Sequence, residues 1–176
     1  CEDLDNLHSL YVDQWDWEQS IKEEDRTLEY LKDTVKSIYS ALKETEYLIY
    51  EEFPHITPRL PKEIKFIHSQ ELLDMFPDLP AKEREAEAAK KYGAIFLIGI
   101  GAPLSNGEPH DGRAPDYDDW SLNADIIVYY PVLDIALELS SMGIRVDRKA
   151  LVEQLEKAGC MERAELPFQK SVIKEE

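Results

Sequence analysis

The chain has 176 residues, of which 43% are hydrophobic and 10% aromatic, which is typical of one soluble globular domain with a sizeable core. Its formal net charge of −17 would repel phosphate backbones and anionic lipids, so we expect no nucleic-acid partner and no membrane partner. Two cysteines are too few for a disulfide framework, and no apolar run reaches membrane-spanning length, which favours a cytoplasmic location.

The first predicted element is a β-strand over residues 9–18, which includes the stretch YVDQWDWE. Alternation places Gln14 and Asp16 on one face and Trp15 and Trp17 on the other. Neither face is cleanly apolar, so the segment predicts either a sheet with a solvated face or the floor of a polar pocket. The two tryptophans could stack a nucleobase, but at strand spacing they are more typical of a core.

The later elements follow from hydrophobic periodicity and from Pro, Gly and capping residues. In chain order they are a helix over 25–53, a strand over 64–69, a helix over 70–76 with Ser69 as its N-cap, a helix over 81–92 that ends at Gly93, a strand over 94–100, a polar loop over 101–123, strands over 125–133, 135–141 and 143–146, a helix over 148–158 and a charged tail. The closing strands are joined by almost no connection, which favours an antiparallel sheet flanked by helices in an α+β fold. A single domain over residues 1–176 is expected.

Three charged side chains interrupt the apolar strands near the end of this pattern. Asp125 and Glu138 lie on neighbouring predicted strands, and a buried carboxylate is usually paired, solvated or bound to a cation. Arg145 follows within GIRV, where its planar fork matches a carboxylate; it either binds a ligand or pairs with Glu138. Together with Gln14 and Asp16, these residues predict a pocket for a zwitterionic amino acid and a metal-bound polyphosphate.

Five stretches, in order along nearly the whole chain, carry a resemblance to a known family. They are LHSLYVDQWDWE, FIHSQELL, GAIFLIGIG, RAPDYDDWS and ELSSMGIRVD. The chain resembles the ammonia-dependent asparagine synthetases (aspartate-ammonia ligases), whose fold is similar to the catalytic core of class II aminoacyl-tRNA synthetases. The resemblance implies that the β-carboxylate of L-aspartate attacks ATP to give β-aspartyl-AMP and pyrophosphate, and that ammonia then displaces AMP to give L-asparagine. It also implies Mg²⁺ and a homodimer.

The resemblance assigns roles residue by residue. It implies that Arg145 binds a substrate carboxylate, that Gln14 and Asp16 bind the amino end of the substrate, and that Asp118 and Ser141 complete this pocket. It places Asp125 and Glu138 at the magnesium and ATP. On its own, the acidic run DYDDW that contains Asp118 would be interpreted as a solvated loop.

The chain also departs from the family pattern. The family has further segments before Cys1 and after Glu176, and it usually carries a longer loop between Ser121 and Leu122. Its LNGD motif is LNAD at residues 122–125. The chain is therefore expected to be a fragment that is inactive alone.

Weaker motifs and other functions stay open. GIGAPLSNG follows a strand but has no Lys-Ser/Thr pair, so it is a poor phosphate loop. His110 and Asp111 could be a base and its orienting group, although a hydrogen bond within the loop is the simpler interpretation. The alternative to an enzyme is a non-catalytic, amino-acid-binding paralogue; an aspartyl-tRNA synthetase is disfavoured because no basic face is visible.

Overall fold

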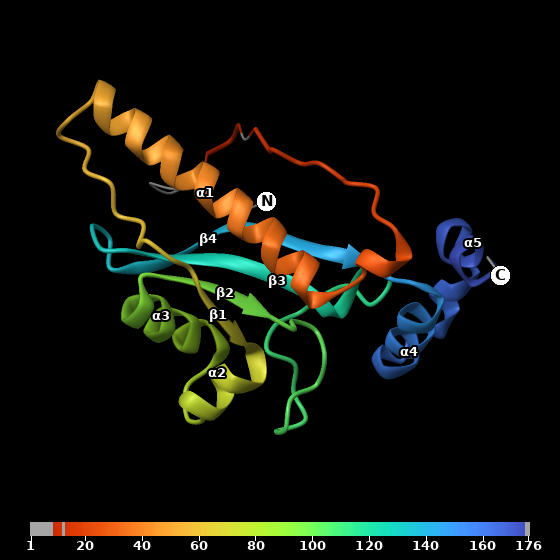
Figure 1. Cartoon of the computed structure of the whole chain (residues 1–176). Helices are drawn as coiled ribbons and strands as arrows, with labels where there is room; N and C mark the ends of the chain where they lie inside the picture. Colours follow the sequence, from red (N-terminus) through yellow and green to blue (C-terminus); the bar gives the residue numbers. More distant parts are fainter. Residues whose placement is uncertain (1–8, 12, 175–176) are drawn as a thin grey trace.

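A computed structural model describes residues 9–11 and 13–174, with a four-stranded sheet at its centre (Figure 1). In spatial order the strands are β1 (Lys65–His68), β2 (Ala94–Ile98), β3 (Asp118–Tyr130) and β4 (Ile135–Arg145). The β2–β3 and β3–β4 pairs are antiparallel, which confirms an α+β fold with a mostly antiparallel sheet. The expectation of antiparallel pairing throughout is wrong for β1 and β2, which are parallel because the crossover through two helices returns the chain to the same end of the sheet.

Helices cover both faces of the sheet (Figure 1). Helix α1 (Leu28–Glu52) packs its apolar stripe on one face, where Val35 meets Phe96 and Ile126 in one core. Helices α2 (Ser69–Met75) and α3 (Ala81–Tyr92) cover the other face, where Leu97 lies in the second core. Because successive strand residues point to opposite faces, Phe96 and Leu97 belong to different cores. The continuous apolar run of β2 is therefore the sequence of a strand buried on both sides.

The C-terminal segment folds as helices and is not an irregular charged tail. Helix α4 (Arg148–Ala158) is followed by the 3₁₀-helix η2 (Met161–Glu165) and by α5 (Pro167–Lys174). Val172 and Ile173 of α5 pack on Leu151 and Leu155 of α4, which forms a third small core. The tail prediction missed these helices because the apolar residues of this segment are scattered among charged ones and give too weak a periodic signal.

The capping residue of α2 also differs from the prediction. His68 is the N-cap, with its Nδ1 atom accepting a hydrogen bond from the Gln70 backbone N–H at 3.1 Å. Ser69 lies inside the helix, is fully buried, and donates a hydrogen bond of 2.6 Å to the Gly99 carbonyl. Ser69 therefore joins α2 to the end of β2 and does not act as a cap.

The predicted loop over 101–123 is shorter in the structure, because β3 begins at Asp118. A bulge separates the Asp118–Arg145 pair from the Asn123–Gly143 pair. The buried Asn123 side chain donates to the Ile100 carbonyl at 2.8 Å and accepts from its N–H at 2.9 Å, which fixes the start of the loop to β3. The three strands predicted between residues 125 and 146 are two long ones, since residues 143–145 continue β4.

The strand predicted over residues 9–18 is wrong for the residues described there. Residues 9–11 and 13–22 belong to no helix or strand and pair with no strand of the described chain, and Val12 lies outside it. Trp15 is 98% exposed and Trp17 is 57% exposed, so neither ring belongs to the core. A short 3₁₀-helix, η1 (Glu23–Asp25), then leads into α1.

Among residues 9–11 and 13–174, no helix is both long enough and apolar enough to cross a membrane.

Candidate active site

A cavity of about 1060 Å³ opens between the extended segment 13–23, the first half of α1 and the last half of β4. Six of the seven site residues predicted from the sequence line it: Gln14, Asp16, Asp118, Glu138, Ser141 and Arg145. The seventh, Asp125, is buried on β3 directly opposite Ser141. The structure therefore brings together residues that are up to 131 positions apart in the chain, from Gln14 to Arg145.

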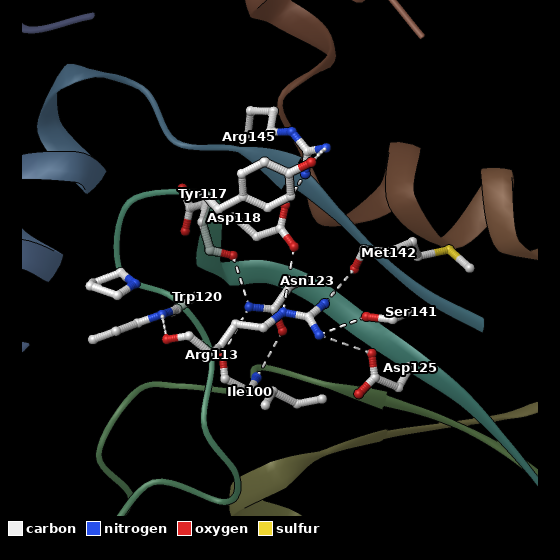
Figure 2. Close-up of polar contacts among 12 residues, drawn as sticks. Ile100, Arg113, Tyr117, Asp118, Trp120, Asn123, Asp125, Ser141, Met142 and Arg145 are labelled. Carbon is white, nitrogen blue, oxygen red and sulfur yellow. Dashed lines mark hydrogen bonds and ion pairs between the residues drawn. The ribbon is translucent and has the colours of Figure 1, made fainter. Parts of the chain in front are cut away.

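Arg145 lies at the end of β4, beside Asp118 and Tyr117 (Figure 2), and two carboxylates hold its guanidinium. Its Nη1 atom donates to Asp118 Oδ1 at 2.5 Å, and its Nη2 atom donates to Glu18 Oε1 at 2.6 Å. The guanidinium also stacks on the Tyr117 ring, 3.5 Å from the ring centroid. The alternative of a structural pair with Glu138 is wrong, because within the described chain the ion pairs of Arg145 are those with Asp118 and Glu18.

Asp118 occupies a position that only a glycine neighbour permits. It is the first residue of β3 and lies opposite Arg145, with Gly143 two residues earlier on β4. A Cβ atom added at Gly143 would lie 2.6 Å from Asp118 Cγ and 2.9 Å from its Cβ, closer than such atoms approach in proteins. The backbone of Gly143 is not in the left-handed region, so the missing side chain serves the close approach of Asp118 and not a turn.

The sequence reasoning missed Glu18 and Tyr117, as well as Arg113, which contacts several residues of this site. From the loop before β3, its Nη1 atom donates to Ser141 Oγ at 2.7 Å and to Asp125 Oδ1 at 3.2 Å, and its Nη2 atom donates to the Met142 carbonyl at 3.2 Å (Figure 2). Its Nε atom lies 3.4 Å from Asp118 Oδ2. The only sequence signal is an arginine within RAPDYDDWS, five residues before Asp118.

Asp125 and Glu138 lie on neighbouring strands, as expected. The surroundings of each carboxyl disfavour its ionised form and raise its pKa. Burial raises the pKa of the Asp125 carboxyl, although the Arg113 guanidinium and the Ser141 hydroxyl oppose this effect. Partial desolvation and the negative charge of Asp125 raise the pKa of Glu138. Glu85 of α3 adds further negative charge to both. A cation bound between Asp125 and Glu138 would relieve this repulsion.

Gln14 and Asp16 lie on the wall of the cavity opposite β4. Both are exposed, and the segment that carries them is held to the sheet through the Glu18–Arg145 contact. Both residues thus line the cavity, but not on the strand on which they were expected.

The weaker motifs resolve as structural contacts. The Nε2 atom of the buried His110 lies 2.9 Å from Glu85 Oε1, whereas Asp111 pairs with Lys82 at 3.0 Å, so His110 and Asp111 do not form a base and its orienting group. In GIGAPLSNG, Gly101 has a φ of +105°, and a Cβ there would lie 2.6 Å from the Trp120 ring. This glycine therefore gives Trp120 space against the loop.

The whole chain that carries this geometry matches one family of known proteins. The family model described as aspartate-ammonia ligase matches residues 1–176. The chain belongs to the aspartate-ammonia ligase family. A Clostridium perfringens protein named aspartate–ammonia ligase is 59% identical over 172 residues, which are 98% of this chain and 51% of that protein.

Two further relatives with the same name agree. The Fusobacterium nucleatum protein is 60% identical over 172 residues, covering 98% of this chain and 53% of its own length. The Bacillus cytotoxicus protein is 53% identical over 174 residues, covering 99% of this chain and 53% of its own. The chain thus spans about half the length of the curated relatives that it matches.

Proposed function

We propose that the protein makes L-asparagine from L-aspartate, ammonia and ATP through β-aspartyl-AMP, with AMP and pyrophosphate as the other products. Membership of the aspartate-ammonia ligase family over the whole chain is the observation that carries this proposal. It is supported by a cavity lined by Arg145 and Glu138, with the buried Asp125 on the neighbouring strand.

The aspartate half of the proposed site consists of Arg145, Asp118, Ser141, Gln14 and Asp16. The fork of Arg145 already has an exposed carboxylate on one side, that of Glu18, whose side chain is 72% exposed. A carboxylate of the substrate would take this place on Nη2 of Arg145, beside the Asp118 bond on Nη1, since a hydrogen bond between two charged groups is stronger than a neutral one. The Gln14 amide and the Asp16 carboxylate would then bind the substrate ammonium, and Asp118 and Ser141 would complete the pocket.

The ATP half consists of Asp125 and Glu138, and their chemistry fits Mg²⁺. Magnesium prefers carboxylate oxygens and is typically bound by one or two carboxylates together with substrate phosphates. When bound, the metal neutralises charge on the phosphates. The residues of the aspartate half would hold the β-carboxylate of aspartate in line with the α-phosphate, which is a contribution of orientation and not of covalent chemistry.

Three further proposals rest on the family resemblance. The sheet would be the catalytic core of a class II synthetase-like fold, the protein would act as a homodimer, and it would work in the cytoplasm. A second function, amino-acid binding without catalysis, is kept because Arg145 and Asp118 alone would suffice for a binder.

We expect the full-length protein to form asparagine and pyrophosphate from aspartate, ATP and ammonium, with no need for glutamine. A glutamine-dependent reaction needs an activated nucleophile, and Cys160 has no paired histidine motif. Product formation is measured by chromatography with either ammonium or glutamine as the nitrogen source. Aspartate binding without asparagine formation would favour the binding protein, and efficient use of glutamine at low ammonium would contradict ammonia dependence.

Replacement of Asp125 by Asn or of Glu138 by Gln should weaken adenylate formation at least about tenfold, because each amide keeps the shape but removes a metal-binding charge. Exchange of labelled pyrophosphate into ATP measures this step. Wild-type exchange in both variants would return the two carboxylates to a structural role.

Glu138→Gln should also change stability in a pH-dependent way. The raised pKa of Glu138 means that the fold favours its protonated form, so the stability of the wild type decreases as the pH rises through that pKa and the carboxyl ionises. Without nucleotide and magnesium, the variant should melt slightly above the wild type at pH 7, and the difference should vanish toward about pH 4. A lower melting temperature of the variant at pH 7 would contradict the assigned repulsion.

A further inference from the structure

Arg113 contacts both halves of the proposed active site from a single loop position. Ser141 and Asp118 belong to the aspartate half, and Asp125 belongs to the ATP half. The same guanidinium also binds the Met142 carbonyl of β4. One side chain thus spans β3 and β4 at the line where the two substrates would meet (Figure 2).

The loop is built to hold this arginine in place. The Arg113 carbonyl accepts a hydrogen bond of 3.3 Å from the Trp120 indole N–H, and Trp120 is buried. On the other side, a Cβ added at Gly101 would lie 2.8 Å from Arg113 Cβ, so the backbone of that glycine packs directly on the arginine stem. The Arg113 side chain is only 15% exposed. Little conformational freedom therefore remains to be lost when substrates bind.

Only a guanidinium can make this set of contacts. Its donors are fixed in one plane, so they reach partners on two strands at once, whereas a lysine ammonium is a point charge on a flexible stem. Lysine at position 113 would still compensate Asp118 or Asp125. It would not hold Ser141 and the Met142 carbonyl in fixed positions relative to those carboxylates.

We propose that Arg113 is a positioning residue that fixes the aspartate half of the site relative to the ATP half. The inference rests on the proposed function, because it assumes that both substrates bind in this site. Arg113 then acts through Asp118, Asp125 and Ser141 rather than on the substrates. The loss of such a residue affects the reaction between two bound substrates more than the binding of either one, because a misplacement of about 1 Å can cost about a hundredfold in rate.

The test compares Arg113→Lys with the wild type in the full-length protein. We expect kcat for adenylate formation to fall by about ten- to a hundredfold, with KM for aspartate and for ATP changed less than about threefold. Calorimetric titration of aspartate alone, and separately of ATP with magnesium, should give dissociation constants close to those of the wild type. Arg163→Lys is the matched control. Arg163 pairs at 2.8 Å with Asp116, which lies on the same loop as Arg113, and Arg163 itself does not contact the site.

The outcomes are distinct. An inactive wild type refutes the proposed function, whereas an active wild type with normal kcat in Arg113→Lys refutes the role of Arg113. A raised KM at unchanged kcat also refutes it, because Arg113 would then support binding only. If the lysine variant does not fold, Arg113→Ala is assayed with ethylguanidinium and ethylammonium. Recovery of kcat with the guanidinium alone supports the inference, and no difference between the two ions overturns it.

Discussion

Gly143→Ala should lower kcat/KM for aspartate by about a hundredfold while the protein still folds. The new methyl group would overlap both Cγ and Cβ of Asp118, so rotation of the carboxylate alone cannot remove the contact. Either the Asp118 side chain leaves its rotamer or the start of β3 shifts, and both break the 2.5 Å bond to Arg145. Alanine fits the backbone of residue 143, so the effect acts through Asp118. Steady-state kinetics and a melting curve measure both parts of this expectation.

The control is Gly112→Ala, because a Cβ at that glycine meets nothing within 4 Å and its φ is not in the left-handed region. Asp118→Ala provides a second comparison. If Gly143→Ala acts by displacing the Asp118 carboxylate, it should add little further loss in the Asp118→Ala background, since the two changes remove the same interaction. Fully additive losses would show that Gly143→Ala acts by a route other than Asp118, and near-normal kinetics in Gly143→Ala alone would show that the close approach does not matter for activity.

Charged residues in and beside the cavity are easier to predict from the sequence than the elements on which they lie. Acidic and basic residues within apolar strands are costly, so Asp125, Glu138 and Arg145 stand out in the sequence by their surroundings. Their partners do not. Arg113 lies in a loop, where an arginine needs no explanation, and its importance appears only when β3 and β4 bring Asp125 and Ser141 within reach of one guanidinium.

The segment 9–18 shows how residues that line the cavity can be predicted on an element that the described chain does not contain. Alternation of polar and aromatic side chains predicts a strand only if a neighbouring strand supplies the hydrogen bonds, and sequence alone cannot show that neighbour. In the described chain the segment lies across the cavity from β4 and joins the sheet through the Glu18–Arg145 contact. The parallel pairing of β1 and β2 is missed for a similar reason, because the sequence of a short strand does not show whether its partner runs parallel or antiparallel to it.

Arg145→Lys is expected to raise the dissociation constant for aspartate by about ten- to a hundredfold and to leave ATP binding nearly unchanged. Lysine keeps the charge but loses the planar fork, which now serves Asp118 on Nη1 and a carboxylate on Nη2. A lost charge-assisted hydrogen bond is worth about 1.5 to 3 kcal/mol, which corresponds to this change in affinity. Calorimetric titration of aspartate into the full-length variant measures it.

A purely structural Arg145 would behave in the opposite way. Its partner would then be Asp118, and lysine could still neutralise that carboxylate, so aspartate affinity would barely change. Arg145→Ala would show its effect in the melting curve, although Arg113 Nε remains 3.4 Å from Asp118 Oδ2 and limits the loss to about 1 to 3 kcal/mol. Unchanged aspartate affinity in a well-folded Arg145→Lys protein would therefore remove Arg145 from the substrate site. A large loss of affinity with an unchanged melting temperature would support a ligand-binding role for Arg145. Asp118 and Tyr117 would then orient the guanidinium, and the ligand carboxylate would bind where the exposed Glu18 carboxylate lies in this structure.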